Sequence, residues 1–304
     1  MAEESDSDVG QANASAQARV QMSTELIRTT SVDQAIGVLA DGDNVRLISG
    51  GIAIGLMMRQ RLIAPKVLVA MQELPELNAI RVSDGELRIG AQVTLRAIAH
   101  SKRVRSQVPA LSQACEVVGN TRIRNVGTLA GNLAEADYAS DPPPVLMCLG
   151  AYCIVRGPER QRSIPISDLI TGFHSTSLSS DEVITEVCVP RSLPGERSTY
   201  LKYVSRSSKD RPCVGVAARA VIEGGVIHDM KLVVGAVADL PTTVDRISNA
   251  VLGRPLDDAT INDVAEDYAA ALGPLYDMRG SSWYRVQIIR VLVRRALNSL
   301  REAS

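Results

Sequence analysis

Residues 125–144 read NVGTLAGNLAEADYASDPPP, and the rest of the chain is best interpreted outward from this stretch. Gly127 and Gly131 lie in a run of small residues, which lets backbone amides approach a ligand closely. Thr128 and Asn132 can add side-chain hydrogen bonds to the same ligand. The stretch therefore predicts a loop that wraps a polar ligand, with an ordinary Gly-rich surface turn as the alternative.

The end of this stretch predicts the start of a helix. Asp141 precedes Pro142, an order typical of a helix N-cap followed by proline in the first turn. The apolar residues 145–149 then continue as a short helix.

Composition sets the class of protein. The chain has 304 residues, 45% hydrophobic and 22% charged, which is enough for two or three domains of an ordinary globular protein. Its net charge of −1 does not indicate a nucleic-acid or membrane-surface partner. We see no apolar run of membrane-spanning length and no signal peptide, so the cytoplasm is the expected compartment.

Cysteine and histidine spacing argues against a metal site in this chain. The five cysteines are widely spaced and form no C-x-x-C pair, so we expect small buried hydrophobic residues without zinc or an iron–sulfur cluster. The three histidines show no ligand spacing either, although His174 lies in a polar loop, residues 172–176, that could approach a ligand.

The N-terminal part predicts a small parallel unit. Residues 1–21 are rich in Ala, Ser, Gln, Asp and Glu, which predicts a disordered leader. A capping box at Ser31 then predicts a helix, followed by a strand over 45–48, a Gly-Gly turn and a helix from Ile52. Such a strand–glycine–helix junction can direct amides at a phosphate, or can be an ordinary turn.

The remaining chain predicts a mixed α+β domain and a smaller C-terminal one. A hairpin with an Asp-Gly turn at 84–85, short helices and strands over 151–155 and 183–189 favour helices on an antiparallel sheet. Beyond a boundary near Pro194, three strands and three helical segments follow. We therefore place a first domain at 22–192, with subdomains of about 22–75 and 76–192, and a second at 197–302.

Three motifs in this order resemble the FAD-binding subunits of the molybdenum hydroxylases. They are the SGGIAI run at 49–54, the GTLAGNL run at 127–133 with Asp141 beyond it, and YLKYVSR at 200–206. The family includes the medium subunit of aerobic carbon monoxide dehydrogenase and the FAD domain of xanthine dehydrogenase. The resemblance covers about residues 22–300 and extends to the GSSWYR tail at 280–285.

The resemblance implies a two-subdomain FAD-binding fold of the PCMH/VAO type, followed by a small three-stranded antiparallel sheet with a helical bundle. It also implies a set of FAD-binding residues. The first pyrophosphate segment is Leu47, Ile48, Ser49, Gly50, Gly51, Ile52, Ala53 and Ile54, and the second is Thr128, Ala130, Gly131 and Asn132. Asp141, Ile184 and Val118 are further contacts, and Lys202 is expected near the flavin, where its charge would favour the reduced ring.

Two departures from the family pattern affect the first and second segments. Ile52 and Ala53 stand where many relatives carry hydroxyl or amide side chains, and Ala130 replaces the first glycine of a frequent G-G-N. We therefore expect FAD to be held mainly by backbone amides and less tightly. A degenerate fold that has lost its cofactor is the alternative.

By resemblance, the chain is the FAD-carrying electron-transfer subunit of a molybdopterin-dependent dehydrogenase or hydroxylase, with no catalytic residue of its own. A large subunit would hold the molybdopterin cofactor and a small subunit two 2Fe–2S clusters, in a dimer of heterotrimers. The final acceptor stays open between oxygen, a quinone, a cytochrome and NAD+. The alternatives are a self-sufficient FAD-dependent oxidase or reductase of a small organic substrate, and a non-catalytic scaffold.

Overall fold

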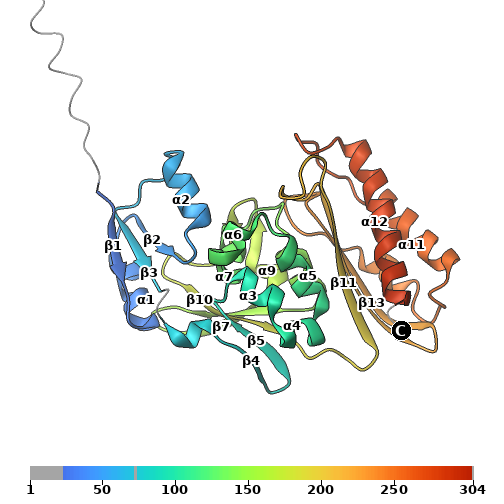
Figure 1. The fold of residues 1–304 in the computed structure, drawn as a ribbon, viewed down its shortest axis with the longest axis horizontal. Helices are drawn as coiled ribbons and strands as arrows, with labels where there is room; N and C mark the ends of the chain where they lie inside the picture. The colour runs from blue at the N-terminus through green and yellow to red at the C-terminus, as the bar shows by residue number, and fades with distance from the viewer. Residues whose placement is uncertain (1–22, 72–73, 303–304) are drawn as a thin grey trace, which may run out of the picture.

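The computed structural model describes residues 23–71 and 74–302. The predicted leader over 1–21 lies outside the described residues. Figure 1 shows three regions in chain order: an N-terminal parallel sheet, a central antiparallel sheet with helices above it, and a C-terminal sheet backed by long helices. None of the helices in the described ranges is both long and apolar enough to span a membrane.

The N-terminal region is the predicted parallel unit. Its elements are β1 (Glu25–Arg28), α1 (Val32–Asp41), β2 (Val45–Ile48), α2 (Ile52–Arg59) and β3 (Val67–Ala70), with strand order β1-β3-β2. Ser31 caps α1 by accepting from the Gln34 amide, as the capping box predicts. Ala35 and Ile36 of α1 pack with Val69 in one apolar cluster. Helix α2 buries none of its residues, so it projects from the sheet with its N-terminus at the Gly-Gly turn.

The central region has a five-stranded sheet in the order β4-β5-β10-β6-β7. These strands are β4 (Ile80–Ser83), β5 (Glu86–Gly90), β6 (Tyr152–Arg156), β7 (Gln161–Pro165) and β10 (Val183–Val189), and every pairing is antiparallel. The β4–β5 turn has Asp84 and Gly85 both at positive φ, as a two-residue hairpin requires. The predicted polar loop over 172–176 forms a small hairpin, β8 (Ile170–Gly172) with β9 (Ser175–Thr176).

Short helices cover this sheet (Figure 1). They are η1 (Pro75–Asn78), α3 (Leu95–His100), α4 (Lys102–Gln107), α5 (Pro109–Val117), α6 (Thr121–Val126), α7 (Leu129–Glu135), α8 (Pro142–Cys148) and α9 (Ile166–Leu169). The predicted loop over 125–144 is wrong in its middle, because α7 occupies it. Thr128 caps this helix through the Gly131 amide, and Leu129 and Leu133 on one face are fully buried.

The C-terminal region is the predicted three-stranded antiparallel sheet with three helices. Its elements are β11 (Glu196–Tyr203), β12 (Val214–Glu223), β13 (Val226–Gly235), α10 (Asp245–Asn249), α11 (Asp258–Ala271) and α12 (Ser282–Glu302). Val216 and Leu232 pack in the core of the C-terminal region, whereas Ala217 and Val233 join the core of the central region. The sheet therefore has a core on each face, which explains the nearly continuous apolar sequence of its middle strand, β12. It lies between the central region and the C-terminal helices (Figure 1).

Arginines of α12 contact α11 at the protein surface. The pairs are Arg290 with Glu266, Arg294 with Asn262 and Arg301 with Asp258. These contacts hold the two long helices together on one side of the sheet.

Candidate functional site

The Gly-Gly turn and the start of α7 meet, although they are far apart in the sequence. Ser49 Oγ lies 2.7 Å from Gln92 Oε1 and 2.8 Å from Thr128 Oγ1. Because the single hydroxyl proton of Ser49 goes to Gln92, Thr128 must donate to Ser49. We call these three residues the hydroxyl cluster (Ser49, Gln92, Thr128). It holds the end of β2 against the first turn of α7.

The glycine pair is required for this contact. A Cβ built on Gly50 would lie 1.9 Å from the Val126 carbonyl oxygen, so only glycine lets the two backbones come this close. Gly51 has a φ of 73°, in the left-handed region that glycine adopts without strain. The two glycines thus have different roles. Gly50 allows the close contact with the Val126 backbone, and Gly51 adopts the positive φ with which the chain enters α2.

The first turn of α2 offers backbone donors. Gly51 caps the helix without any side-chain hydrogen bond. The first N–H groups of a helix lack intrahelical acceptors, and they sit at the positive end of the helix dipole. The backbone N–H groups in the first turn of α2, starting with those of Ile52 and Ala53, therefore form a set of donors suited to an anion. They lie next to the start of α7. The side chains of Ile52 and Ala53 contribute no hydrogen bond, as the sequence predicts.

A buried ion pair forms a second group of predicted residues. Lys202 Nζ lies 3.0 Å from Asp141 Oδ2, and their side chains are only 7% and 3% exposed. The Tyr200 hydroxyl donates to Asp141 Oδ1 at 2.7 Å, and Lys202 also donates to the Val117 carbonyl at 2.9 Å. We call Asp141 and Lys202 the buried pair. It joins the start of α8, in the central region, to the end of β11, in the C-terminal region.

The predicted capping role of Asp141 is only half right. Asp141 occupies the N-cap position of α8, but its side chain makes no cap hydrogen bond. Its carboxylate is used instead by Tyr200 and Lys202. Burial raises the pKa of Asp141 to about 6, although Lys202 and the Tyr200 hydrogen bond lower it in part. Burial, followed by the Asp141 charge, likewise raises the pKa of Tyr200 well above its usual value.

The other predicted residues lie between or beside these two groups. Asn132, in α7, accepts from the Ser140 hydroxyl at 2.8 Å, which links α7 to the residue before Asp141. Val118 follows α5 and is half-buried, with its carbonyl accepting from Arg124. Ile184 is buried within β10, next to a bulge in that strand. A cavity of about 620 Å³ adjoins Val117 and is lined by Arg122, Arg124 and Lys209.

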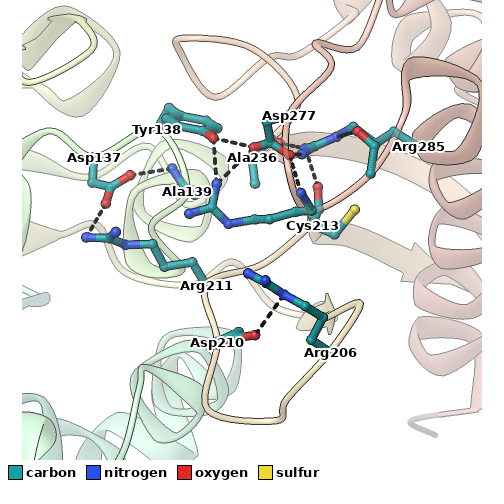
Figure 2. Close-up of polar contacts among 12 residues, drawn as sticks. Asp137, Tyr138, Ala139, Arg206, Asp210, Arg211, Cys213, Ala236, Asp277 and Arg285 are labelled. Atoms are coloured by element: carbon teal, nitrogen blue, oxygen red, sulfur yellow. Dashed lines mark hydrogen bonds and ion pairs between the residues drawn. The ribbon is translucent and has the colours of Figure 1, made fainter.

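A third polar group, not predicted from sequence, ties the segment after α7 to the C-terminal region (Figure 2). Asp277 accepts from the Tyr138 hydroxyl at 2.5 Å, from Arg279 at 2.9 Å and from Arg285 at 2.5 Å. We call this the Asp277 network (Tyr138, Asp277, Arg279, Arg285). Arg285 is fully buried and also donates to the carbonyls of Cys213 and Ala236. Burial opposes ionisation of Asp277. The hydrogen bonds that Asp277 accepts from Tyr138, Arg279 and Arg285 outweigh this effect and hold the pKa of Asp277 well below its usual value.

Some of these residues could have been found from the sequence. Tyr200 and Lys202 are two apart on a predicted strand, so they share a face, and Tyr200 should have been grouped with Lys202. Gln92 and Asp277 carry no such signal, because Ser49 lies 43 positions from Gln92 and Tyr138 lies 139 positions from Asp277.

Comparisons with known proteins match all three regions. Residues 20–192 match the family described as FAD binding domain in molybdopterin dehydrogenase. Residues 199–300 match the family described as CO dehydrogenase flavoprotein C-terminal domain. Together the two matches cover nearly all the described residues.

Individual relatives match over almost their full length. The glyceraldehyde dehydrogenase medium chain of Sulfolobus acidocaldarius is 32% identical, covering 90% of this chain and 97% of its own. The reconstituted CO dehydrogenase from Oligotropha carboxidovorans superposes with a TM-score of 0.88 at 26% identity, covering 93% of this chain and 99% of its own. Quinoline 2-oxidoreductase from Pseudomonas putida 86 gives a TM-score of 0.87 at 28% identity, with 92% and 97% covered.

Proposed function

Because the chain belongs to the family of FAD-binding medium subunits of molybdenum hydroxylases, we propose that it is an electron-transfer subunit. It takes electrons from the 2Fe–2S clusters of a partner subunit and passes them, through FAD, to an external acceptor. The observation that carries this proposal is the close approach of Gly50 to Val126, which brings the two predicted pyrophosphate segments together. When bound, FAD supplies exchange between single electrons and electron pairs.

The residues at this approach fit a dinucleotide pyrophosphate. The turn 49–51 ends in a helix whose first amides have no side-chain cap, and an anion can accept from them. The hydroxyl cluster fixes the turn beside α7, so these donors are set before any ligand arrives. In this proposal Leu47 to Ile54 and Thr128 to Asn132 hold the pyrophosphate mainly through their backbone.

The buried pair fits a role beside the flavin ring. Lys202 brings a positive charge to the boundary of the two regions, and Asp141 offsets part of it. Ile184, through its backbone, and Val118 supply further contacts in the same proposal. A positive charge near the ring favours its reduced form, and a negative charge opposes it. The chain's own contribution is thus to bind the ring, exclude water and set the local charge.

The opposite charges of Lys202 and Asp141 allow a direct test of the site. Lys202→Met should lower the flavin midpoint potential by tens of millivolts, because it removes the positive charge. Asp141→Asn should raise the potential, because it removes the negative charge that offsets Lys202. Spectroelectrochemical titration of the purified subunit measures both. Potentials that stay unchanged, or that move in the same direction, would place the buried pair away from the ring.

The partners follow from the relatives. These are named medium chains, and one related structure is titled as a Cu,Mo-CO dehydrogenase. For the present chain we propose the assembly that the resemblance implies: a large molybdopterin-binding subunit, a small iron–sulfur subunit and a dimer of heterotrimers. All five cysteines are buried and free, which fits a reducing cytoplasm.

The competing function is a self-sufficient FAD-dependent oxidase or reductase. It predicts that the isolated chain turns over an organic substrate, whereas the subunit proposal predicts FAD binding without turnover. A steady-state assay of the isolated, FAD-loaded chain with dichlorophenolindophenol separates the two. Turnover at the rate of an intact enzyme would overturn the subunit proposal.

A further inference from the structure

The Tyr200 hydroxyl ends inside the protein, against the Asp141 carboxylate of the buried pair. Tyr200 is 5% exposed and donates to Asp141 Oδ1 at 2.7 Å, while Lys202 donates to Oδ2 at 3.0 Å. Each carboxylate oxygen thus has one side-chain donor among the described residues. The Asp141 side chain is only 3% exposed, so water has little access to it. Removal of the Tyr200 hydroxyl would therefore leave Oδ1 as a buried acceptor without this donor, which is costly for a charged carboxylate.

Two neighbouring residues fix the place of this hydroxyl. The Tyr200 amide donates to Gln113 Oε1 of α5 at 2.8 Å, which holds β11 against that helix at this residue. Gly215 of β12, which pairs with Lys202 in the sheet, leaves room for the Tyr200 ring. A Cβ built on Gly215 would lie 2.4 Å from the Tyr200 hydroxyl oxygen, so a larger residue there must displace the hydroxyl. Glycine weakens a strand, and inside one it often marks such a close approach.

The titratable groups that face Asp141 from the described elements are few. From α5 comes the Cys115 thiol, whose pKa is raised further by burial and by the Asp141 charge, so it stays neutral. Gly215 of β12 carries no charge. From β11 come Lys202 and Tyr200, and burial keeps Tyr200 protonated. Burial opposes the charged form of Asp141, whereas Lys202 and the Tyr200 hydrogen bond favour it, and the resulting pKa of Asp141 is about 6.

We propose that Tyr200 is a positioning residue that keeps Asp141 ionised beside Lys202, and that Gly215 is required because it leaves space for the Tyr200 hydroxyl. The inference rests on the proposed function, in which the buried pair lies beside the flavin. An ionised Asp141 offsets the charge of Lys202, whereas a protonated Asp141 leaves that charge to favour the reduced ring. Tyr200 therefore sets the pH below which the flavin becomes easier to reduce.

The first measurement uses the full chain without flavin, so that it reports on Tyr200 and Asp141 alone. NMR of protein with labelled aspartate follows the Asp141 carboxyl, which is assigned by its absence from Asp141→Asn. Tyr200→Phe should move the titration of this carboxyl up by about one pH unit, because a hydrogen bond to the charged form is lost. Gly215→Ala should move it in the same direction, because the added methyl group displaces the hydroxyl.

The matched control is a second buried tyrosine, which has no carboxylate partner. Tyr268 is fully buried in the core of the C-terminal region, and its hydroxyl donates to the Leu232 carbonyl at 3.2 Å. Tyr268→Phe removes a hydroxyl just as Tyr200→Phe does, and it should leave the titration of Asp141 unchanged.

The second measurement is the flavin midpoint potential of the FAD-loaded chain as a function of pH. Between about pH 6 and pH 7, Asp141 is protonated more often in Tyr200→Phe, so this variant should have a higher potential than the wild type. The difference should shrink above about pH 8 and below about pH 5, where Asp141 is in the same state in both proteins. In an Asp141→Asn background, Tyr200→Phe should cause no difference that depends on pH.

Three results would overturn this role of Tyr200. They are a carboxyl titration that neither Tyr200→Phe nor Gly215→Ala moves, a potential difference that is the same at every pH, and a pH-dependent difference that persists in Asp141→Asn. Failure of the proposed function looks different. A chain that retains no FAD overturns that function, while the carboxyl titration still shows whether Tyr200 controls the charge of Asp141.

Discussion

Gly50 is the residue on which the proposed cofactor site depends most directly. Gly50→Ala puts a Cβ within 1.9 Å of the Val126 carbonyl, so the two pyrophosphate segments must separate. We expect a loss of about 1–3 kcal/mol in the free energy of unfolding, as for other overpacked sites. We also expect most of the bound FAD to be lost. Denaturant unfolding and the ratio of flavin to protein absorbance measure the two effects.

The matched control for Gly50 lies in the same segment. A Cβ added at Gly55, within α2, meets nothing within 4 Å. Gly55→Ala should therefore keep its FAD and stabilise the helix by about 0.5–1 kcal/mol. If Gly50→Ala behaves like this control, the contact between the two segments does not matter for FAD binding.

Asp141 should make stability depend on pH. Its pKa is raised to about 6 in the folded protein from an ordinary value near 3.8, so the folded state holds the proton more tightly than the unfolded chain does. The stabilising contribution of protonated Asp141 is then complete below about pH 4 and is lost as the pH rises to about 6. The change in the free energy of unfolding is on the order of 3 kcal/mol, because each pKa unit corresponds to about 1.4 kcal/mol.

The measurement compares the flavin-free wild type with Asp141→Asn, which cannot titrate at this position. The difference in free energy of unfolding between the two should move in favour of the wild type as the pH falls from 6 to 4. A difference that is constant over this range, or that moves the other way, would show that Asp141 is not buried as described.

At the scale of elements, α7 shows what the sequence can and cannot predict. The motif was singled out for its glycines and was expected to form a loop. Its first turn instead combines an N-cap at Thr128 with a buried stripe of Leu129 and Leu133, both of which are visible in the sequence. The error came from treating Gly131 as a loop signal, whereas a single glycine inside a helix costs only about 1 kcal/mol.

The strands and long helices were easier to predict. The parallel unit, the Asp-Gly hairpin and the C-terminal sheet all have local signals, namely alternating apolar residues and turn residues between them. Contacts between regions have no such signal. Neither the Asp277 network nor the link from Gln92 to Ser49 could be predicted, because each depends on how separate elements pack.

The Asp277 network should contribute strongly to the stability of the contact between the central and C-terminal regions. Asp277→Asn leaves the fully buried Arg285 without its carboxylate, and we expect a loss of about 3 kcal/mol in the free energy of unfolding. Tyr138→Phe removes two hydrogen bonds, one donated to Asp277 and one accepted from Arg279, and should cost about 1–2 kcal/mol. Thermal and denaturant unfolding of both variants measure these losses.

An exposed ion pair provides the comparison for this network. Asp263→Asn breaks the contact with Arg254, whose side chain is 40% exposed, and should cost less than about 1 kcal/mol. If Asp277→Asn costs no more than Asp263→Asn, the network does not hold the regions together.

At the scale of the whole molecule, the central and C-terminal regions pack on opposite faces of one sheet. The buried pair and the Asp277 network both cross the boundary between these two regions. The predicted FAD-binding residues fall into two groups: the segments at the Gly-Gly turn and α7, and the buried pair beyond them. They are joined by the hydrogen bond between Asn132 and Ser140. The arrangement suits an extended dinucleotide, with its pyrophosphate at the first group and its ring at the second.

The central claim is that this chain relays electrons through FAD and does not oxidise a substrate by itself. The most direct measurement is the visible absorbance of the flavin when an organic substrate is added without oxygen. The account predicts bleaching in the intact complex and none in the isolated, FAD-loaded chain. Bleaching of the isolated chain by that substrate would contradict it.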